Sequence, residues 1–122
     1  MEVKKMKLFD AELKVMEVLW DQGPLAAGQL AKILRDDTGW NRNTTYTVIK
    51  KLVDKGAVQR TDPQFICEAL ITREQVQEQE TLGLIQKMYK GSTELFFSAF
   101  INKKNLSDSE IEKLKKIVED LK

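Results

Sequence analysis

Three short amphipathic segments, each ended by a glycine, limit the fold of this chain more than any other feature. Their apolar residues recur at helical spacing, so we expect helices over residues 10–22, 26–37 and 44–55. Gly23-Pro24, Gly39 and Gly56 follow these segments and supply the stops. Asp10 and Asn43 are the expected N-caps of the first and third helices. The sequence therefore predicts a small helical domain at the N-terminal end.

Two β-like segments follow the third helix. Residues 57–61 and 65–70 flank Asp62-Pro63-Gln64, a sequence that favours a tight turn. We expect a hairpin with Val58 facing the core, and we assign Trp20 and Trp40 to the same core. Three helices and then a hairpin is the order of a winged helix-turn-helix.

The pattern changes after Leu70. Thr72 with Gln75 forms a capping-box pattern that opens a long helix to about residue 89, and residues 90–92 break it. A short apolar helix over residues 93–101 and a last helix opened by Ser107 with Glu110 complete the chain. The expected organisation is mainly α: a DNA-binding domain over residues 1–70 and a three-helix dimerisation region over residues 71–122.

The three C-terminal helices have sparse, one-sided apolar faces that are too small to fold alone. They either pack back on the N-terminal part or pair with a second copy. We prefer the second interpretation, because the long helix is polar for its first two turns and is expected to project away. The expected dimer interface consists of Val76, Ile85, Met88, Tyr89, Leu95, Phe96, Phe97, Phe100, Ile111, Leu114, Val118 and Leu121.

The third helix, about residues 43–55, is the expected recognition helix. Its hydroxyl, amide and basic side chains can meet base edges or phosphates, and a basic residue of the hairpin can reach the adjacent backbone. The expected DNA-binding residues are Arg42, Asn43, Thr44, Thr45, Tyr46, Thr47, Lys50, Lys51 and Arg60. Each also has a structural interpretation: Thr44 as a helix-start residue, for example, or Tyr46 as a cover for the apolar rim. Lys55 is expected only to complement the helix dipole.

The basic residues are concentrated near this helix. Residues 39–60 carry a charge of +4 and the rest of the chain −3, although the net charge is only +1. A local basic segment is typical of a nucleic-acid footprint. Charge by itself favours a solvated helix face, so the argument depends on the order of the elements as well.

The composition excludes most enzyme mechanisms. The chain has no histidine and a single cysteine, Cys67, so His-dependent catalysis, an intrachain disulfide and an ordinary zinc site are not expected. We predict no catalytic residue, no metal and no cofactor. With 42% hydrophobic and 32% charged residues and no signal or membrane-spanning stretch, the chain is expected to be a folded cytoplasmic protein without membrane insertion.

Several stretches resemble the penicillinase-repressor (BlaI/MecI/CopY) family. They lie within residues 10–20, 38–40, 43–56, 88–92 and 106–111, and so extend over nearly the whole chain. The resemblance implies a homodimeric winged-helix repressor that binds an inverted-repeat operator in double-stranded DNA and is not an enzyme. The copper-responsive branch of the family uses clustered cysteines near the C-terminus, which residues 119–122 lack.

The resemblance also implies a route of induction. Such repressors are typically inactivated by a membrane-bound sensor protease that perceives a β-lactam antibiotic, with cleavage at an Asn-Phe bond among the C-terminal helices. The corresponding position here is Ala99-Phe100, which matches in the phenylalanine and not in the asparagine. Whether proteolytic induction operates therefore stays open, as do the inducer and the regulated genes. The competing function is a winged-helix module that binds protein without specific DNA readout.

Overall fold

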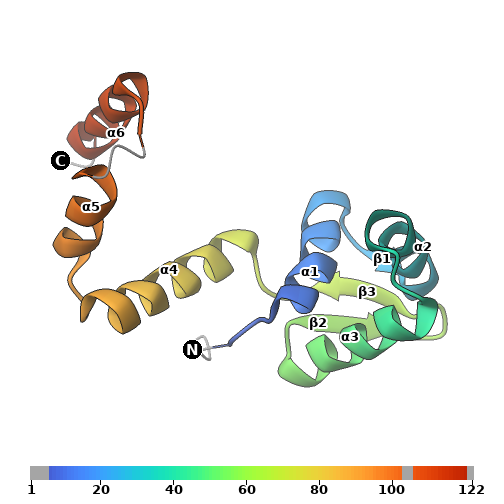
Figure 1. The fold of residues 1–122 in the computed structure, drawn as a ribbon. Helices are drawn as coiled ribbons and strands as arrows, with labels where there is room; N and C mark the ends of the chain where they lie inside the picture. Colours follow the sequence, from blue (N-terminus) through green and yellow to red (C-terminus); the bar gives the residue numbers. More distant parts are fainter. Residues whose placement is uncertain (1–5, 103–105, 121–122) are drawn as a thin grey trace. The chain divides into compact units, whose positions relative to one another are not determined.

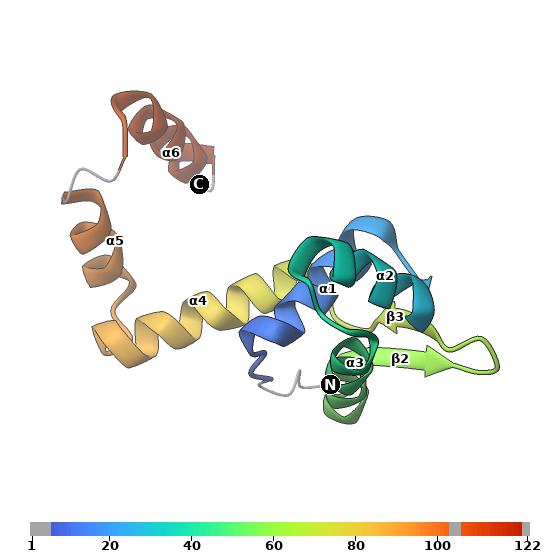
Figure 2. The ribbon, with the colours of Figure 1, turned by 45° about the vertical axis from the view of Figure 1, so that its right-hand side comes forward.

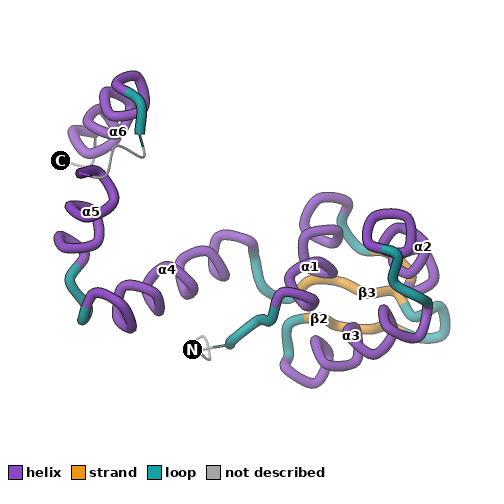
Figure 3. Tube along the Cα trace, in the orientation of Figure 1, coloured by secondary structure: helices purple, strands orange, loops and turns teal. Residues whose placement is uncertain are grey.

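A computed structural model describes residues 6–102 and 106–120 of the chain. They divide between two compact units, Met1–Glu80 and Thr81–Lys122. The first unit contains helices α1 (Asp10–Gln22), α2 (Ala27–Thr38) and α3 (Arg42–Lys55), and strands β1 (Leu25–Ala26), β2 (Val58–Thr61) and β3 (Ile66–Ala69) (Figures 1 and 3). Helix α4 (Arg73–Tyr89) begins in this unit, and α5 (Thr93–Asn102) and α6 (Asp108–Asp120) belong to the second unit. The expected class is confirmed: a mainly helical chain with a winged helix-turn-helix.

The core of the first unit lies between its helices and its small sheet. Met16, Leu30 and Leu52 come from α1, α2 and α3 and are fully buried together. Their spacing puts one apolar face of each helix inward, as the sequence pattern predicts. Trp20 and Trp40 are partly buried and pack against this cluster.

Two helix starts differ from the prediction. Asp10 is the first residue of α1 and not its cap; the backbone N–H of Phe9 donates to Glu12 Oε1 over 2.8 Å. Helix α3 is capped by Asn41, whose side-chain oxygen accepts the Thr44 N–H at 2.8 Å, so Asn43 lies inside the first turn. The side chain of Asn41 caps α3 in the expected way, whereas Phe9 at the start of α1 makes no side-chain cap hydrogen bond.

The sheet has three antiparallel strands in the order β1-β3-β2. The expected hairpin is confirmed by β2 and β3, with Val58 and Cys67 buried. Strand β1 was not predicted, because two residues after a proline carry no alternation and are fixed only by pairing with β3. In Figure 2 the loop that joins β2 to β3 extends beyond the three helices, as a wing does.

The first unit ends later than the sequence suggests. Val76 is 6% exposed and belongs to the core cluster of this unit. The opening turns of α4 are therefore part of the N-terminal unit, which extends to Glu80 rather than to Leu70. Val76 in the core and the ion pairs of Arg73 with α1 hold these first turns, and the projection of the rest of the long helix stays a prediction.

The second unit contains the rest of α4, then α5 and α6.

The predicted capping boxes are both present: Thr72 with Gln75 at the start of α4, and Ser107 with Glu110 at the start of α6. The bonds from Ser107 lower the pKa of the Glu110 carboxyl. The Phe96 ring meets Tyr89 and Phe97 edge-on, each with centroids 5.3 Å apart. In the part of the chain that the structure describes, no helix is long and apolar enough to cross a membrane.

Candidate nucleic-acid interface

Helix α3 presents one buried and one exposed row of side chains. Thr45, Val48, Ile49 and Leu52 face the core. On the other side, exposed residues recur at helical spacing, and they are Asn43, Thr47, Lys50 and Lys51. This row combines an amide, a hydroxyl and two cations, which suits base edges and phosphates together.

Local hydrogen bonds hold the polar side chains at the start of α3. The Thr44 hydroxyl donates to Asn41 Oδ1 at 3.0 Å, and the Thr47 hydroxyl donates to the Asn43 carbonyl oxygen at 2.9 Å. Both hydroxyl groups are on exposed residues, and a hydroxyl that donates in this way keeps lone pairs that can accept. Thr44 is thus part of the helix cap, as its structural interpretation predicts, and is also accessible.

Arg42 and Tyr46 form a pair at the edge of the exposed row. Arg42 Nη2 donates a hydrogen bond to the Tyr46 hydroxyl oxygen at 2.8 Å. The guanidinium carbon of Arg42 also lies over the Tyr46 ring, 5.1 Å from its centroid. The partly buried Tyr46 ring also packs against the core, so it does cover the apolar rim. The pair lies close to Gly28 of α2, since a Cβ there would come within 3.8 Å of Arg42 Nη2.

A basic hollow beside this pair was missed by the sequence analysis. Its volume is about 260 Å³, and its lining residues are Gly28, Ala31, Lys32, Arg35 and Arg42. Lys32 and Arg35 lie three residues apart on α2, which places them on one helix face. That spacing next to the recognition helix is the signal from which they could have been found.

The remaining cations have different surroundings. Lys50 Nζ lies 3.3 Å from Asp54 Oδ2, and both side chains are exposed. Arg60, exposed on β2, lies 3.9 Å from Asp62 and stacks over the Phe65 ring at 5.1 Å. Arg60 is therefore held at the wing with an aromatic neighbour that the sequence analysis did not select.

Two expectations for α3 are wrong. Thr45 is 0% exposed, so its side chain belongs to the core and leaves the set of expected DNA contacts. Lys55 does more than complement the helix dipole: its Nζ lies 2.6 Å from Glu12 Oε1 and donates to the Lys7 carbonyl oxygen at 2.7 Å. This ion pair joins the end of α3 to the start of α1, a contact between residues far apart in the sequence.

The comparisons with known proteins identify the family of this chain. The family model described as penicillinase repressor matches residues 8–120. The chain belongs to the penicillinase repressor family. It is 27% identical over 120 residues to the methicillin resistance regulatory protein MecI of Staphylococcus aureus (strain N315), with 97% of this chain and 98% of MecI covered. The penicillinase repressor of Bacillus licheniformis is 26% identical over 118 residues, with 95% and 92% covered.

Two solved structures resemble part of this chain. The solution structure of the DNA-binding domain of the repressor BlaI has a TM-score of 0.54 at 27% identity, covering 59% of this chain and 90% of that one. The B. licheniformis BlaI monomer in complex with the blaP half-operator has a TM-score of 0.50 at 27% identity, covering 58% and 89%. The penicillinase repressor family is a family of DNA-binding transcriptional repressors and not of enzymes.

The expected dimer-interface residues of this chain fall into three groups. Val76 belongs to the core of the first unit and Ile85 is 5% exposed, so neither offers surface to a second copy. Leu121 lies outside the described residues. The others are exposed or partly exposed: Met88, Tyr89, Leu95, Phe96, Phe97, Phe100, Ile111, Leu114 and Val118. Ala99 and Phe100 lie inside α5.

The single cysteine has no reactive character. Cys67 is 0% exposed on β3, and burial raises the pKa of its thiol. Its Sγ lies 3.5 Å from the Phe65 carbonyl oxygen. Among the described residues, no group of three or more Cys, Asp or Glu side chains is placed to hold a metal ion.

Proposed function

We propose that this chain is a homodimeric transcriptional repressor that reads an inverted-repeat operator with α3. The observation that carries the proposal is the exposed row of Asn43, Thr47, Lys50 and Lys51 on a helix-turn-helix. An exposed carboxamide suits a bidentate contact with adenine in the major groove. The similarity to a BlaI monomer bound to a half-operator supports the same use of this fold. A repressor acts where the chromosome is, so we place the protein in the cytoplasm.

We assign phosphate contacts to the cations around this row. Lys51 is exposed on α3, and Lys32 and Arg35 line the basic hollow of α2. Cations around a recognition helix fix its register on the duplex, whereas the polar row reads the bases. Arg60 on the wing extends the basic surface to the neighbouring backbone or minor groove. Arg42 with Tyr46 joins the two regions.

The second unit supports the homodimer. Large apolar side chains that are each 36–63% exposed gather in its helices, and they include Met88, Leu95, Phe97, Phe100 and Val118. Exposed apolar surface of this extent is typical of an interaction site. A second copy of the chain covers it most simply, because two-fold symmetry then presents two α3 helices to two half-sites.

We propose that proteolysis among these helices relieves repression, through the membrane-bound, β-lactam-sensing protease that the family resemblance implies. The bond between Ala99 and Phe100 lies in α5, where Phe100 is 44% exposed and its ring stacks on that of Phe96 with the centroids 6.3 Å apart. A cut there divides the aromatic cluster that we assign to the dimer. Loss of the dimer then separates the half-sites and lowers operator affinity.

Selection of DNA fragments by the purified native chain tests the proposal. We expect enrichment of a palindromic site bound by two chains, and Asn43→Ala should lose preference for that site. Gln59→Ala, an exposed residue on β2, is the matched control and should retain it. Enrichment of no sequence, with binding to random fragments as strong as to any selected one, would contradict operator reading and favour a protein-interaction module.

A further inference from the structure

Arg73 is in a position that helix electrostatics alone disfavour. It is the first residue of α4, where the positive end of the helix dipole repels a cation. The structure gives it two acidic partners on another helix. Arg73 Nη2 lies 2.6 Å from Asp21 Oδ1 and 2.9 Å from Glu17 Oε2. These hydrogen bonds raise the pKa of the guanidinium further, so Arg73 stays charged.

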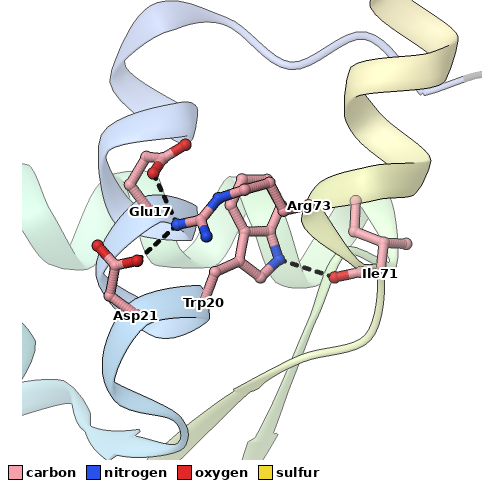
Figure 4. Close-up of polar contacts among 5 residues, drawn as sticks. All are labelled: Glu17, Trp20, Asp21, Ile71 and Arg73. Atoms are coloured by element: carbon pink, nitrogen blue, oxygen red, sulfur yellow. Dashed lines mark hydrogen bonds and ion pairs between the residues drawn. The ribbon is translucent and has the colours of Figure 1, made fainter. Parts of the chain in front are cut away.

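Trp20 completes this contact between α1 and the start of α4. The Arg73 guanidinium lies over its ring, 5.4 Å from the centroid, and the indole Nε1 donates to the Ile71 carbonyl oxygen at 2.9 Å. Figure 4 shows the guanidinium between Trp20 and the two carboxylates. Glu17, Trp20 and Asp21 lie on one face of α1 because they are spaced by three and four residues. We call these five residues, Glu17, Trp20, Asp21, Ile71 and Arg73, the Arg73 clamp.

The clamp binds the chain on both sides of the turn into α4. Ile71 lies before the capping-box residue Thr72 and is held to α1 through its backbone carbonyl, and Arg73 lies directly after Thr72 and is held through its side chain. Val76 adds an apolar contact one turn later. The clamp residues all belong to the first unit, and α4 continues without a break to Tyr89. Fixing the first turn of a continuous helix limits the directions that its later turns can take.

We propose that Arg73 is a positioning residue that sets which half-site spacing the dimer accepts. The inference depends on the proposed function, in which residues of the second unit join two copies. If α4 is held firmly on α1, the two α3 helices are restricted to few separations. One added base pair moves a half-site by about 3.4 Å and turns it by about 35°. A dimer with fixed α4 starts should reject that change, and a loosened dimer should tolerate it.

Two opposite ways of breaking the clamp separate geometry from charge. Arg73→Ala removes a cation, and the double variant Glu17→Gln/Asp21→Asn removes two anions. A simple charge effect on DNA affinity would have opposite signs in the two proteins. A positioning effect is the same in both. Lys14→Ala, at an exposed cation of α1, controls for the loss of one charge, and melting temperatures establish that each variant folds.

The experiment measures dissociation constants of the full chain for three DNA probes derived from the site that the native chain selects. They are the isolated half-site, the palindrome, and the palindrome with one base pair added between its half-sites. We expect both clamp variants to reduce the discrimination between the two palindromes several-fold, toward unity. At the half-site, Arg73→Ala should differ from the native chain only by the charge effect that Lys14→Ala calibrates, and the double variant only by a charge effect of opposite sign.

Arg73→Glu combined with Asp21→Arg rebuilds the network with the arginine between two acidic side chains, so it should restore spacing discrimination. Discrimination that stays native in both clamp variants overturns the inference. A half-site affinity that falls far more for Arg73→Ala than for Lys14→Ala also overturns it, since Arg73 then contacts DNA or supports the fold of α3. A native chain that binds the palindrome no better than the half-site contradicts the proposed dimer itself, which is a different result.

Discussion

Val76→Ala distinguishes the core of the first unit from a dimer interface. The Val76 side chain is 6% exposed within its own chain, although its place on a one-sided helix face also suits a contact with a second copy. The substitution removes two buried methyl groups, worth about 1.6 kcal/mol at about 0.8 kcal/mol each. The cavity left behind adds to this, so we expect the free energy of unfolding to fall by about 2–3 kcal/mol.

Urea denaturation of a fragment covering residues 1–80 measures this loss directly, because that fragment contains the whole core to which Val76 belongs. The free energy lost at a core residue is the same at every protein concentration, whereas the free energy lost at an interface residue falls to zero at concentrations where the protein is monomeric. Gln77→Ala, at the neighbouring exposed position, is the matched control and should change little. An unchanged urea midpoint for Val76→Ala in the fragment would refute the assignment.

Four further predictions follow from individual contacts. Thr45→Val should leave the melting temperature unchanged or higher and DNA affinity unaltered, because the buried hydroxyl has no hydrogen-bond partner; a marked loss of either would return Thr45 to the interface. Lys55→Ala should lower the free energy of unfolding in urea by about 1–3 kcal/mol, because the buried Glu12 carboxylate loses its cation. Lys51→Ala should weaken binding to the selected site and to random DNA alike and reduce the slope of log K against log salt by about 0.9. Asn43→Ala should instead lose about 1–3 kcal/mol of binding free energy at the selected site and less on random DNA. Phe100→Ala should raise the dimer dissociation constant in analytical ultracentrifugation at low micromolar protein, and a variant that stays fully dimeric would remove the link between cleavage and derepression.

Local signals were sufficient for most of the secondary structure. The glycine stops after α1, α2 and α3, and the capping box of Thr72 with Gln75, depend on residues close together in the sequence. Such signals do not decide whether Asn41 or Asn43 caps α3, because asparagine is a good cap at either position. In the structure Asn41 is the cap, since its Oδ1 accepts from both the backbone N–H and the hydroxyl of Thr44.

The missed features depend on contacts between distant residues. Strand β1 forms only because it pairs with β3, about forty residues later in the sequence. Lys55 likewise forms its ion pair with Glu12, 43 residues earlier. An apolar residue at helical spacing shows that a face is buried and not which surface covers it. For that reason the sequence predicts Val76 in the dimer interface, whereas the structure places it in the core. The basic hollow of Lys32 and Arg35 likewise requires α2 and α3 to be side by side.

The salt dependence of binding by the native chain tests the central claim, that this protein is a DNA reader, most directly. The measurement is the association constant for the selected palindrome across a series of salt concentrations. We predict that its logarithm falls linearly with the logarithm of salt, with a slope of about −0.9 for each phosphate neutralised by cations such as Lys51, Lys32 and Arg35. A slope near zero, with equal affinity for random DNA, would contradict the account.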